Sequence, residues 1–299
     1  MTKPNLHVAI AILVHNNNVL VGWRNADQHQ GNKYEFPGGK VEEQESPVQA
    51  CQREVKEEVG IDINQWKKFD FIRHEYDDVI VHLHFFMAHV AVELAETIEK
   101  PWQWYSRNQL LDLNFPKANT AIVKKLYWQK FIKITDDFSA LNNIENDRLI
   151  YLRVDATEEV RREISQVSVE ALSKVILNID VWNNLNELQK RSVTTLHIKQ
   201  HQLNTLTKDN LDVTKRYIAS CHDLDSVLKA EQLGCDAVLL SPVLETPTHP
   251  EAEGLGWKEF ADIAKQSKVL VFGLGGLSPN DLKKAIEHYA YGVAGIRNF

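Results

Sequence analysis

The sequence predicts two α/β domains: a sheet-based domain over residues 1–128 and a (β/α)₈ barrel over residues 129–299. A length of 299 residues is enough for two ordinary domains. Before residue 129, β-rich runs dominate the pattern. From residue 131 onward, short apolar runs alternate with helical stretches, which is typical of parallel βαβ units. This change of pattern alone places the boundary near Gln129 and Lys130.

The first domain is expected to be mostly sheet, with two helices. Its β-rich runs are residues 6–14, 19–23, 34–39, 66–76, 79–90 and 102–105. Residues 15–18 (HNNN) join the first two as a hairpin, and residues 34–39 enter a glycine turn. Ser46 and Pro47 are suited to the N-cap and first turn of a helix that ends at Gly60. Residues 118–128 have helical periodicity.

The second domain is expected to contain eight strands. They are residues 131–135, 149–154, 175–177, 195–198, 217–221, 237–241, 269–274 and 292–296. Helical patterns such as residues 223–233 and 278–288 lie between them. Eight such units predict a closed barrel, although the ~170 residues of this part fall below the ~250 typical of that fold.

Composition excludes several classes of protein. Hydrophobic content of 43% and charged content of 25% are those of a soluble globular chain. A net charge of −7 argues against direct nucleic-acid binding. No apolar run reaches the ~18 residues of a membrane span, and the N-terminal run alternates like a strand rather than a signal peptide. Three unpatterned cysteines are typical of a reducing cytoplasm and exclude a disulfide framework.

Residues 39–61 (GKVEEQESPVQACQREVKEEVGI) concentrate acidic residues on one helix. Glu54, Glu57 and Glu58 are spaced i, i+3 and i+4, so their carboxylates share one helix face. Like charges placed this way repel, and a bound cation would offset the repulsion. Mg²⁺ or Mn²⁺, which prefer oxygen ligands, suit the cluster best.

This stretch resembles a complete Nudix box, with every fixed position filled. The resemblance implies a Nudix α/β/α sandwich with a mixed sheet between helices. It also implies hydrolysis of a nucleoside diphosphate linked to another moiety. Glu42 and Glu43 are not among the fixed positions, and we expect them to be solvated.

In the Nudix interpretation, Glu54, Glu57 and Glu58 supply carboxylate ligands to the metal. The carbonyl of Gly38 or Gly39 can add a neutral oxygen, because glycine lets the backbone approach closely.

Supporting roles are expected for residues around this face. Arg53 is expected to orient a carboxylate through a bidentate bond, and Glu45 to do the same from the helix start. Members of the family often use a further glutamate outside the box as ligand or base. Glu99 is the candidate for that role and Glu96 the reserve.

Within the family, the first ~128 residues most resemble the MutT group, which hydrolyses oxidised purine nucleoside triphosphates such as 8-oxo-dGTP to the monophosphate and pyrophosphate. Residues 34–40 (YEFPGGK) are close to that group's pattern. Arg24 matches a nucleotide-contacting arginine, and His29 lies in the next loop, where a solvated histidine is an equal alternative. Phe36 could stack on a base, although core packing is the better interpretation for this residue alone.

Asn119 is the candidate reader of the purine edge. It ends residues 115–119 (FPKAN), which match a stretch of the MutT group in which the asparagine has that role. An amide can donate and accept hydrogen bonds in one plane, as recognition of a purine requires. The alternative is a helix N-cap, which fits its position equally well.

Residues ~130–299 resemble thiamine-phosphate synthase. The resemblance rests on residues 219–222 (ASCH), 240–249 (LSPVLETPTH), 272–277 (FGLGGL) and 292–296 (GVAGI), at ends of the expected strands. The N–H groups of Gly275 and Gly276 could hold a phosphate ahead of the next helix. Alternatively, these glycines only permit a tight turn.

This part departs from the synthase pattern where metal ligands are expected. The expected aspartate is Ile179, or Asp180 displaced by one, and the run at residues 197–202 (HIKQHQ) lacks a second acidic ligand. Arg153 does match the family. We therefore expect a degenerate barrel that binds a phosphorylated ligand or only packs against the first domain. A bifunctional thiamine-linked enzyme is the alternative.

Overall fold

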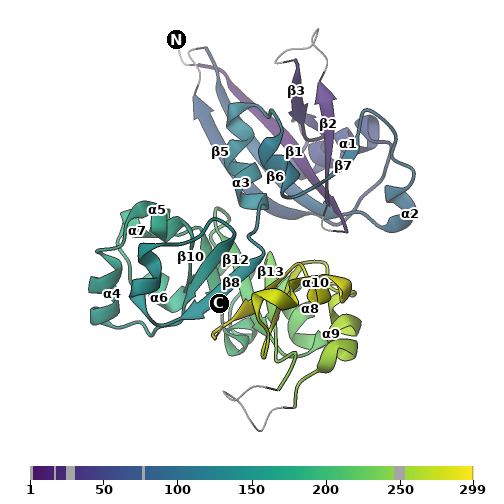
Figure 1. Ribbon diagram of the computed structural model, residues 1–299. Coiled ribbons are helices and arrows are strands. Elements are labelled where there is room, and N and C mark those ends of the chain that lie inside the picture. The colour runs from purple at the N-terminus through teal and green to yellow at the C-terminus, as the bar shows by residue number, and fades with distance from the viewer. Residues whose placement is uncertain (1–2, 17, 25–30, 76–77, 246–252, 298) are drawn as a thin grey trace. The chain divides into compact units, whose positions relative to one another are not determined.

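The computed structural model describes residues 3–16, 18–24, 31–75, 78–245, 253–297 and 299. The chain divides into two compact units, Met1–Trp128 and Gln129–Phe299 (Figure 1). Among the described residues, no helix has the length and apolar character needed to cross a membrane.

The first unit is built on a seven-stranded mixed sheet. Its central strands are β1 (Asn5–His15) and β6 (Ile80–His89), which pair in parallel over ten residues. The order is β3-β2-β1-β6-β5, with β4 paired to β1 and β7 paired to β2. The remaining strands are β2 (Asn18–Arg24), β3 (Lys33–Glu35), β4 (Gly38–Lys40), β5 (Lys67–Glu75) and β7 (Gln103–Ser106).

Each face of this sheet has its own apolar core, because successive residues of β1 point to opposite sides. Ala9, Ala11 and Leu13 pack with helix α1 (Pro47–Glu58). Ile10, Ile12 and Val14 pack with helix α3 (Thr120–Leu126). The shorter elements are α2 (Val92–Ala95) and the 3₁₀ turns η1 (Gln109–Asp112) and η2 (Lys117–Asn119). The unit is thus a sheet between helices, as expected.

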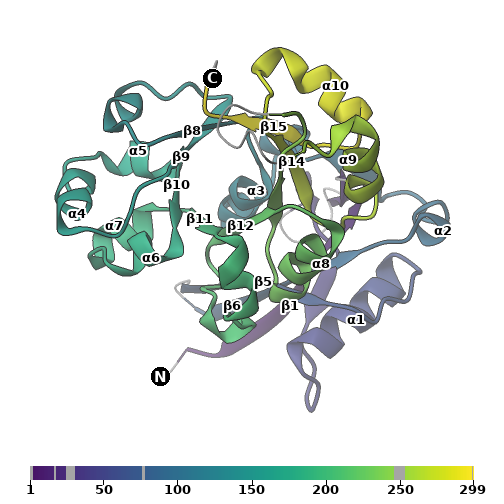
Figure 2. The ribbon, with the colours of Figure 1, turned by 90° about the horizontal axis from the view of Figure 1, so that it is seen from below.

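The second unit is a closed barrel of eight parallel strands, in the order β10-β11-β12-β13-β14-β15-β8-β9 (Figure 2). The strands are β8 (Phe131–Thr135), β9 (Arg148–Leu152), β10 (Val175–Asn178), β11 (Thr195–Ile198), β12 (Arg216–Cys221), β13 (Ala237–Leu240), β14 (Leu270–Leu274) and β15 (Gly292–Gly295).

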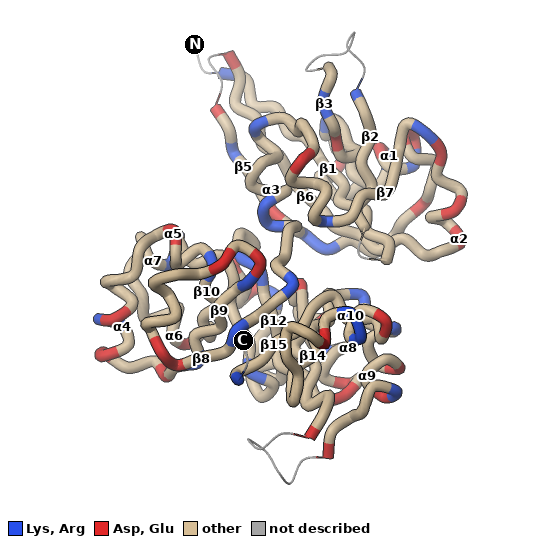
Figure 3. Tube along the Cα trace, in the orientation of Figure 1, with Lys and Arg blue, Asp and Glu red and all other residues tan. Residues whose placement is uncertain are grey.

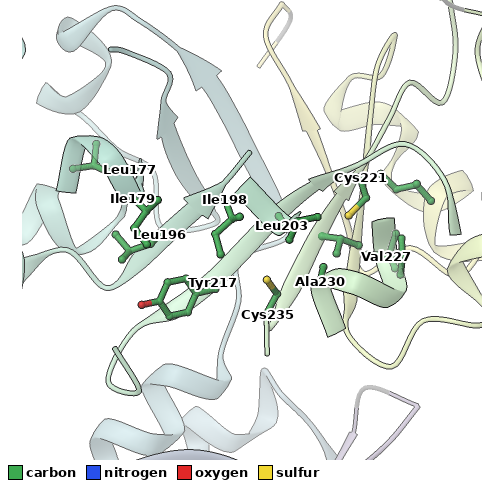
Figure 4. Packing of buried hydrophobic residues seen from close by; sticks show 14 of the residues in the cluster. Leu177, Ile179, Leu196, Ile198, Leu203, Tyr217, Cys221, Val227, Ala230 and Cys235 are labelled. Atoms are coloured by element: carbon green, nitrogen blue, oxygen red, sulfur yellow. The ribbon is translucent and has the colours of Figure 1, made fainter. Parts of the chain in front are cut away.

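Short helices surround the barrel and bury its outer face. They are α4 (Glu158–Ile164), α5 (Val169–Ser173), α6 (Ile179–Asn183), α7 (Glu187–Ser192), α8 (Leu224–Leu233), α9 (Gly256–Ala264) and α10 (Leu282–Glu287). The 3₁₀ turns are η3 (Phe138–Asn142), η4 (Gln200–Asn204), η5 (Lys208–Asn210) and η6 (Pro279–Asp281). Figure 4 shows one part of this core, where Val227 and Ala230 of α8 lie beside Cys221 and Cys235. Short helices and turns let a barrel close with so few residues.

The sequence-based fold class is confirmed for both units, and the differences are local. The first hairpin forms, with Val14 paired to Val19 and His15 to Asn18. The expected glycine turn at residues 34–39 is wrong in detail, because Gly38 and Gly39 lie in β4 and pair with β1. The helix expected at 118–128 begins as a 3₁₀ turn and ends at Leu126.

Candidate active site

Helix α1 places the glutamates of residues 39–61. Ser46 is its N-cap and Pro47 its first residue, and the backbone N–H of Ser46 donates to Oε1 of Gln49 at 2.8 Å. The helix ends before Gly60, whose φ of +79° is typical of a glycine that follows a helix C-terminus. Ala50, Cys51 and Val55 face the sheet. The acidic residues of α1 therefore lie off this buried stripe. Figure 3 marks the acidic positions along the chain trace in red.

The two glycines of β4 bring backbone directly against this helix. The N–H of Gly38 donates to Oε2 of Glu58 at 3.0 Å. A Cβ on Gly39 would lie 2.2 Å from Oε1 of Glu54, and one on Gly38 would lie 2.2 Å from the carbonyl oxygen of Ala9. At Gly38 a side chain would collide with backbone, so this position requires glycine, whereas at Gly39 a side chain would displace the Glu54 carboxylate from the strand.

Arg53 holds three carboxylates with one guanidinium group. Its Nη2 and Nε donate to the two oxygens of Glu45 at 2.8 and 3.3 Å. Its Nη1 donates to Glu54 at 2.8 Å and to Glu57 at 3.3 Å. Nη2 also reaches the carbonyl oxygen of Lys40 at 3.0 Å, which ties α1 to the end of β4. The fork of Arg53 is thus bidentate to Glu45 and shared between the other two.

These contacts shift the pKa values of the partners in opposite directions. Hydrogen bonds from Arg53 lower the pKa of Glu45 below its usual value. The carboxylate partners, Glu45 foremost, raise the pKa of Arg53 further. The arginine therefore stays charged and keeps Glu45 ionised.

Glu58 differs from its neighbours. Its carboxyl lies against β4, and the resulting loss of hydration raises the pKa of Glu58 to about 7. Repulsion from Glu54 and Glu35 adds to the rise, while the N–H of Gly38 and the charge of Arg24 oppose it.

The chemistry of this donor set fits a hard divalent cation. Glu54, Glu57 and Glu58 offer carboxylate oxygens beside the backbone of Gly39, and no soft ligand is among them. In the described part of the chain, no three His, Cys, Asp or Glu side chains converge closely enough to hold an ion as they stand. The hydrogen bonds account for this, because Arg53 draws two carboxylates and Gly38 draws the third.

The opposite face of the sheet carries Phe36 and Asn119. Phe36 is 5% exposed and stacks on Phe115, with ring centroids 4.8 Å apart, as the core-packing interpretation expects. Asn119 is 7% exposed. It stands at the N-cap position of α3, but its side chain makes no capping bond. Asn119 thus occupies the N-cap position that the alternative interpretation expects, although its side chain does not cap the helix.

Inside the barrel, polar side chains of three strands bond to one another, with β10 lying between β9 and β11 in the barrel order. The hydroxyl of Tyr151 on β9 lies 2.9 Å from Nδ1 of His197 on β11, whose Nε2 lies 2.8 Å from Oγ of Ser220 on β12. The two rings stack at 4.4 Å. Burial lowers the pKa of His197 to about 3, so this imidazole is neutral. The three side chains therefore form a row of neutral groups that bond to one another.

The positions of the expected barrel metal ligands hold something else. Ile179 is buried in the apolar core, and Asp180 is exposed at the first turn of α6. Nε2 of Gln202 donates to Asp180 at 2.9 Å, and Asn178 donates to Oε1 of Gln202 at 3.1 Å. A single carboxylate held by an amide replaces the expected acidic pair.

Gly275 and Gly276 have φ values of +104° and +68°. A Cβ on Gly275 would lie 2.8 Å from Pro242, and one on Gly276 would lie 2.7 Å from Cβ of Leu244. The positive φ values of the turn and its close packing against residues 242–244 explain why both positions are glycine. After η6, only the six residues of α10 follow as helix.

The comparisons with known proteins agree with this division. A model of the NUDIX domain matches residues 8–125. The 8-oxo-dGTP diphosphatase of Escherichia coli (strain K12) is 37% identical over 129 residues, which cover 40% of this chain and 95% of that protein. The chain belongs to the Nudix hydrolase family. As such, it is a hydrolase that acts on phosphorus anhydrides.

Three further matches add to this description of the Nudix hydrolase. The CTP pyrophosphohydrolase of Escherichia coli (strain K12) is 37% identical over 26% of this chain and 58% of that protein. A model of thiamine monophosphate synthase matches residues 154–299. The thiamine-phosphate synthase of Nostoc sp. is 33% identical over 34% of this chain, but the match spans only 30% of that protein. The hydrolase unit is therefore fused to a thiamine-phosphate-synthase-like barrel.

The fold of the Nudix unit joins some of the expected site residues and separates others. Arg53, the glutamates of α1 and the glycines of β4 come together. Glu99 and Glu96 are exposed near α2, and no contact of either carboxylate with those of α1 is recorded in the described ranges. Trp102 Nε1 donates to the carbonyl of Glu58 at 2.8 Å. Trp102 directly precedes β7, so the loop that carries Glu99 ends close to the C-terminal end of α1. His29 lies outside the described residues.

Glu35 is a residue of the Nudix site that sequence reasoning missed. Nε of Arg24 donates to its carboxylate at 2.6 Å, and both groups influence the pKa of Glu58. The pairing of β2 with β3 brings the two side chains together. The available signal was the acidic residue inside the YEFPGGK run, but the register of this short strand pair was not predictable from its pattern.

Proposed function

We propose that the Nudix unit hydrolyses oxidised purine nucleoside triphosphates, with 8-oxo-dGTP converted to 8-oxo-dGMP and pyrophosphate in a Mg²⁺-dependent reaction. Mn²⁺ is an alternative ion. The role would be removal of a mutagenic precursor from the cytoplasmic nucleotide pool before DNA replication uses it. The similarity to 8-oxo-dGTP diphosphatases shows the family, and the proposal is that the substrate is shared as well.

The observation that carries the proposal is the path of residues 36–39 through the sheet. Phe36 lies on the α3 side and stacks on Phe115, which comes just before the Lys117–Asn119 turn in the sequence. Two residues later, Gly38 bonds to Glu58 on the α1 side. One short segment therefore connects a candidate base site to a candidate phosphate site, as binding of a single nucleotide requires.

At the base end, Asn119 has the chemistry to read a purine. Its amide carries two donors and an acceptor in one plane, and none of them is used to cap α3. The residue is largely buried, which strengthens hydrogen bonds and makes an unmatched base edge costly. Discrimination between a purine and its oxidised form would come from this amide.

At the phosphate end, Glu54, Glu57 and Glu58 would hold the cation, with Gly38 or Gly39 adding a carbonyl oxygen. When bound, Mg²⁺ neutralises pyrophosphate charge and orients the attacking water. Arg53 would position the carboxylates, and Arg24 would meet the nucleotide while Glu35 orients its guanidinium. Glu99 remains the candidate for a further ligand or base.

For the barrel, we propose a degenerate unit that binds a phosphorylated ligand or serves a structural role. The loss of all but one carboxylate, Asp180, at the positions of the expected acidic ligands supports this, because Ile179 is apolar and Asp180 is held by Gln202. The alternative is a bifunctional enzyme whose barrel makes thiamine phosphate. Growth of a thiamine-phosphate-synthase auxotroph carrying this chain, on medium without thiamine, would favour the alternative and overturn the degenerate assignment.

The hydrolase proposal is tested with a panel of 8-oxo-dGTP, dGTP, CTP and ADP-ribose in Mg²⁺. We expect kcat/KM to be highest for 8-oxo-dGTP, and Asn119→Ala to lower that preference by about 10- to 100-fold through the loss of one paired amide. Asn108→Ala, at an exposed position, is the matched control. If wild-type protein turns over CTP or ADP-ribose far faster than 8-oxo-dGTP, the sanitising role is wrong.

A further inference from the structure

Three histidines gather on the α1 face of the first sheet, beyond the glutamate site. His7 lies on β1, and His82 and His84 lie on the neighbouring strand β6. Residues i and i+2 of a strand point to the same face, and His7 is paired directly with His82. The two strands lie side by side in Figure 1. This places three imidazoles on adjacent positions of one surface.

The three rings are in contact. Nδ1 of His7 lies 2.9 Å from Nε2 of His84. The ring of His7 stacks on that of His82, with centroids 4.5 Å apart and planes 7° apart. His7 is exposed and the other two are half-buried, so the cluster is open to solvent. Neither core packing nor the hydrolase site accounts for it.

The hydrogen bonds indicate which nitrogens can act as ligands. Nε2 of His82 lies 2.9 Å from Oδ1 of Asn5, and an amide oxygen only accepts, so Nε2 carries the proton. The lone pair of His82 is therefore on Nδ1. A ring whose second nitrogen is held by such an acceptor has the arrangement found at metal-binding histidines.

The surroundings favour neutral rings. Partial burial and repulsion from His7 lower the pKa of His82 and of His84 below the usual value. Arg73 and Lys68 face the cluster from β5 and lower them further. Phe71 of the same strand packs on both rings, at 5.9 Å from His82 and 5.0 Å from His84. Neutral imidazoles beside an apolar ring are ready to bind a metal without first losing protons.

We propose that His7, His82 and His84 form a site for a borderline transition-metal ion, Zn²⁺ in the first instance. Three imidazoles suit Zn²⁺, whereas Mg²⁺ prefers oxygen donors. The nitrogens of His7 and His84 are already close enough to share an ion after a change of tautomer. As the described side chains stand, three donors do not converge. The site therefore requires the rings of His7 and His82 to leave their stack when the ion binds.

Such an ion would link β1 to β6 near the start of both strands and leave a fourth position to water. It would be separate from the Mg²⁺ expected at the glutamates, and the proposal does not depend on the substrate of the hydrolase. Because imidazoles bind metal only when unprotonated, affinity should fall as pH drops below the usual pKa of histidine, ~6.5.

The test is equilibrium dialysis of the full chain against Zn²⁺ at pH 7.5 in excess Mg²⁺, with bound zinc measured directly. Wild-type protein should retain a zinc ion that His84→Gln and His7→Gln bind at least about tenfold more weakly. His74→Gln is the matched control, because His74 lies on β5 of the same sheet and points to the opposite face. Co²⁺ in place of Zn²⁺ should give a visible spectrum that His84→Gln abolishes.

Equal zinc binding by wild type, His84→Gln and His74→Gln would overturn the proposal, as would absence of bound zinc from wild-type protein. Circular dichroism of each variant establishes that it is folded. Should His84→Gln fail to fold, His7→Gln decides the matter, because His7 is exposed and packs least.

Discussion

The two units organise their polar clusters in opposite ways. On α1, charged carboxylates crowd together and a single arginine, Arg53, holds three of them. In the barrel, Tyr151, His197 and Ser220 are neutral and bond to one another. A cluster of repelling carboxylates costs stability unless cations offset it, whereas neutral side chains that bond to one another do not repel. The comparison is in line with the proposal that the cation-dependent chemistry belongs to the first unit.

The largest expected effect is loss of the charged cluster itself. Glu54→Gln should lower kcat for nucleotide hydrolysis by about 10²- to 10³-fold, because it removes a carboxylate that would hold the cation, and the cation is what would neutralise charge at the reacting phosphates. Glu43→Gln, at an exposed position in the same stretch, should retain wild-type kcat. If kcat falls equally in the two variants, Glu54 has no specific role in the reaction.

A smaller loss is expected when the guanidinium fork is replaced by an ammonium group. Arg53→Lys keeps the charge but cannot span Glu45, Glu54 and Glu57, so kcat should fall about 10- to 100-fold and more Mg²⁺ should be needed for half activity. Lys56→Arg, at an exposed position of the same helix, is the control. An unchanged Mg²⁺ requirement would argue against a positioning role.

In the barrel, the expected effect is on stability alone. Tyr151→Phe leaves Nδ1 of the buried His197 without its partner and should lower the free energy of unfolding of the barrel by about 1–3 kcal/mol. Hydrolysis by the first unit should be unchanged. Urea unfolding of the full chain measures the first quantity, with Tyr289→Phe, an exposed tyrosine, as control. A loss of hydrolase activity in Tyr151→Phe would contradict the separation of roles.

The smallest expected effect is a pH dependence of the first unit. The pKa values of His82 and His84 are lowered in the folded chain. The unfolded chain therefore binds more protons as pH falls through the usual histidine range near ~6.5, and stability present above that range is lost below it. The melting temperature without added zinc should fall from pH 7.5 to pH 5.5.

His82→Gln should reduce that fall, because it removes one titrating ring and its repulsion of the others. The control is again His74→Gln. If the melting temperature of His82→Gln falls as steeply as that of wild type, the imidazole cluster does not contribute to the pH dependence.

Much of the fold was predictable because its signals are local. The eight barrel strands were placed within about two residues, since each is a short apolar run between helical patterns. The error at Gly38 and Gly39 has a physical cause. Glycine is common in turns, and only the pairing of these residues with Ala9 and Ile10 makes them a strand.

The sequence by itself determined the acidic face of α1, because the positions of Glu54, Glu57 and Glu58 relative to one another depend only on helical spacing. It also determined where that helix begins and ends, through Ser46, Pro47 and Gly60.

Tertiary structure decided which distant groups meet. The bond from Gly38 to Glu58, the pairing of Arg24 with Glu35 and the contact of His7 with His84 all join separate strands or a strand and a helix. Such contacts depend on strand register and on the packing of α1 against the sheet, and a shift of one residue would move each side chain to the opposite face.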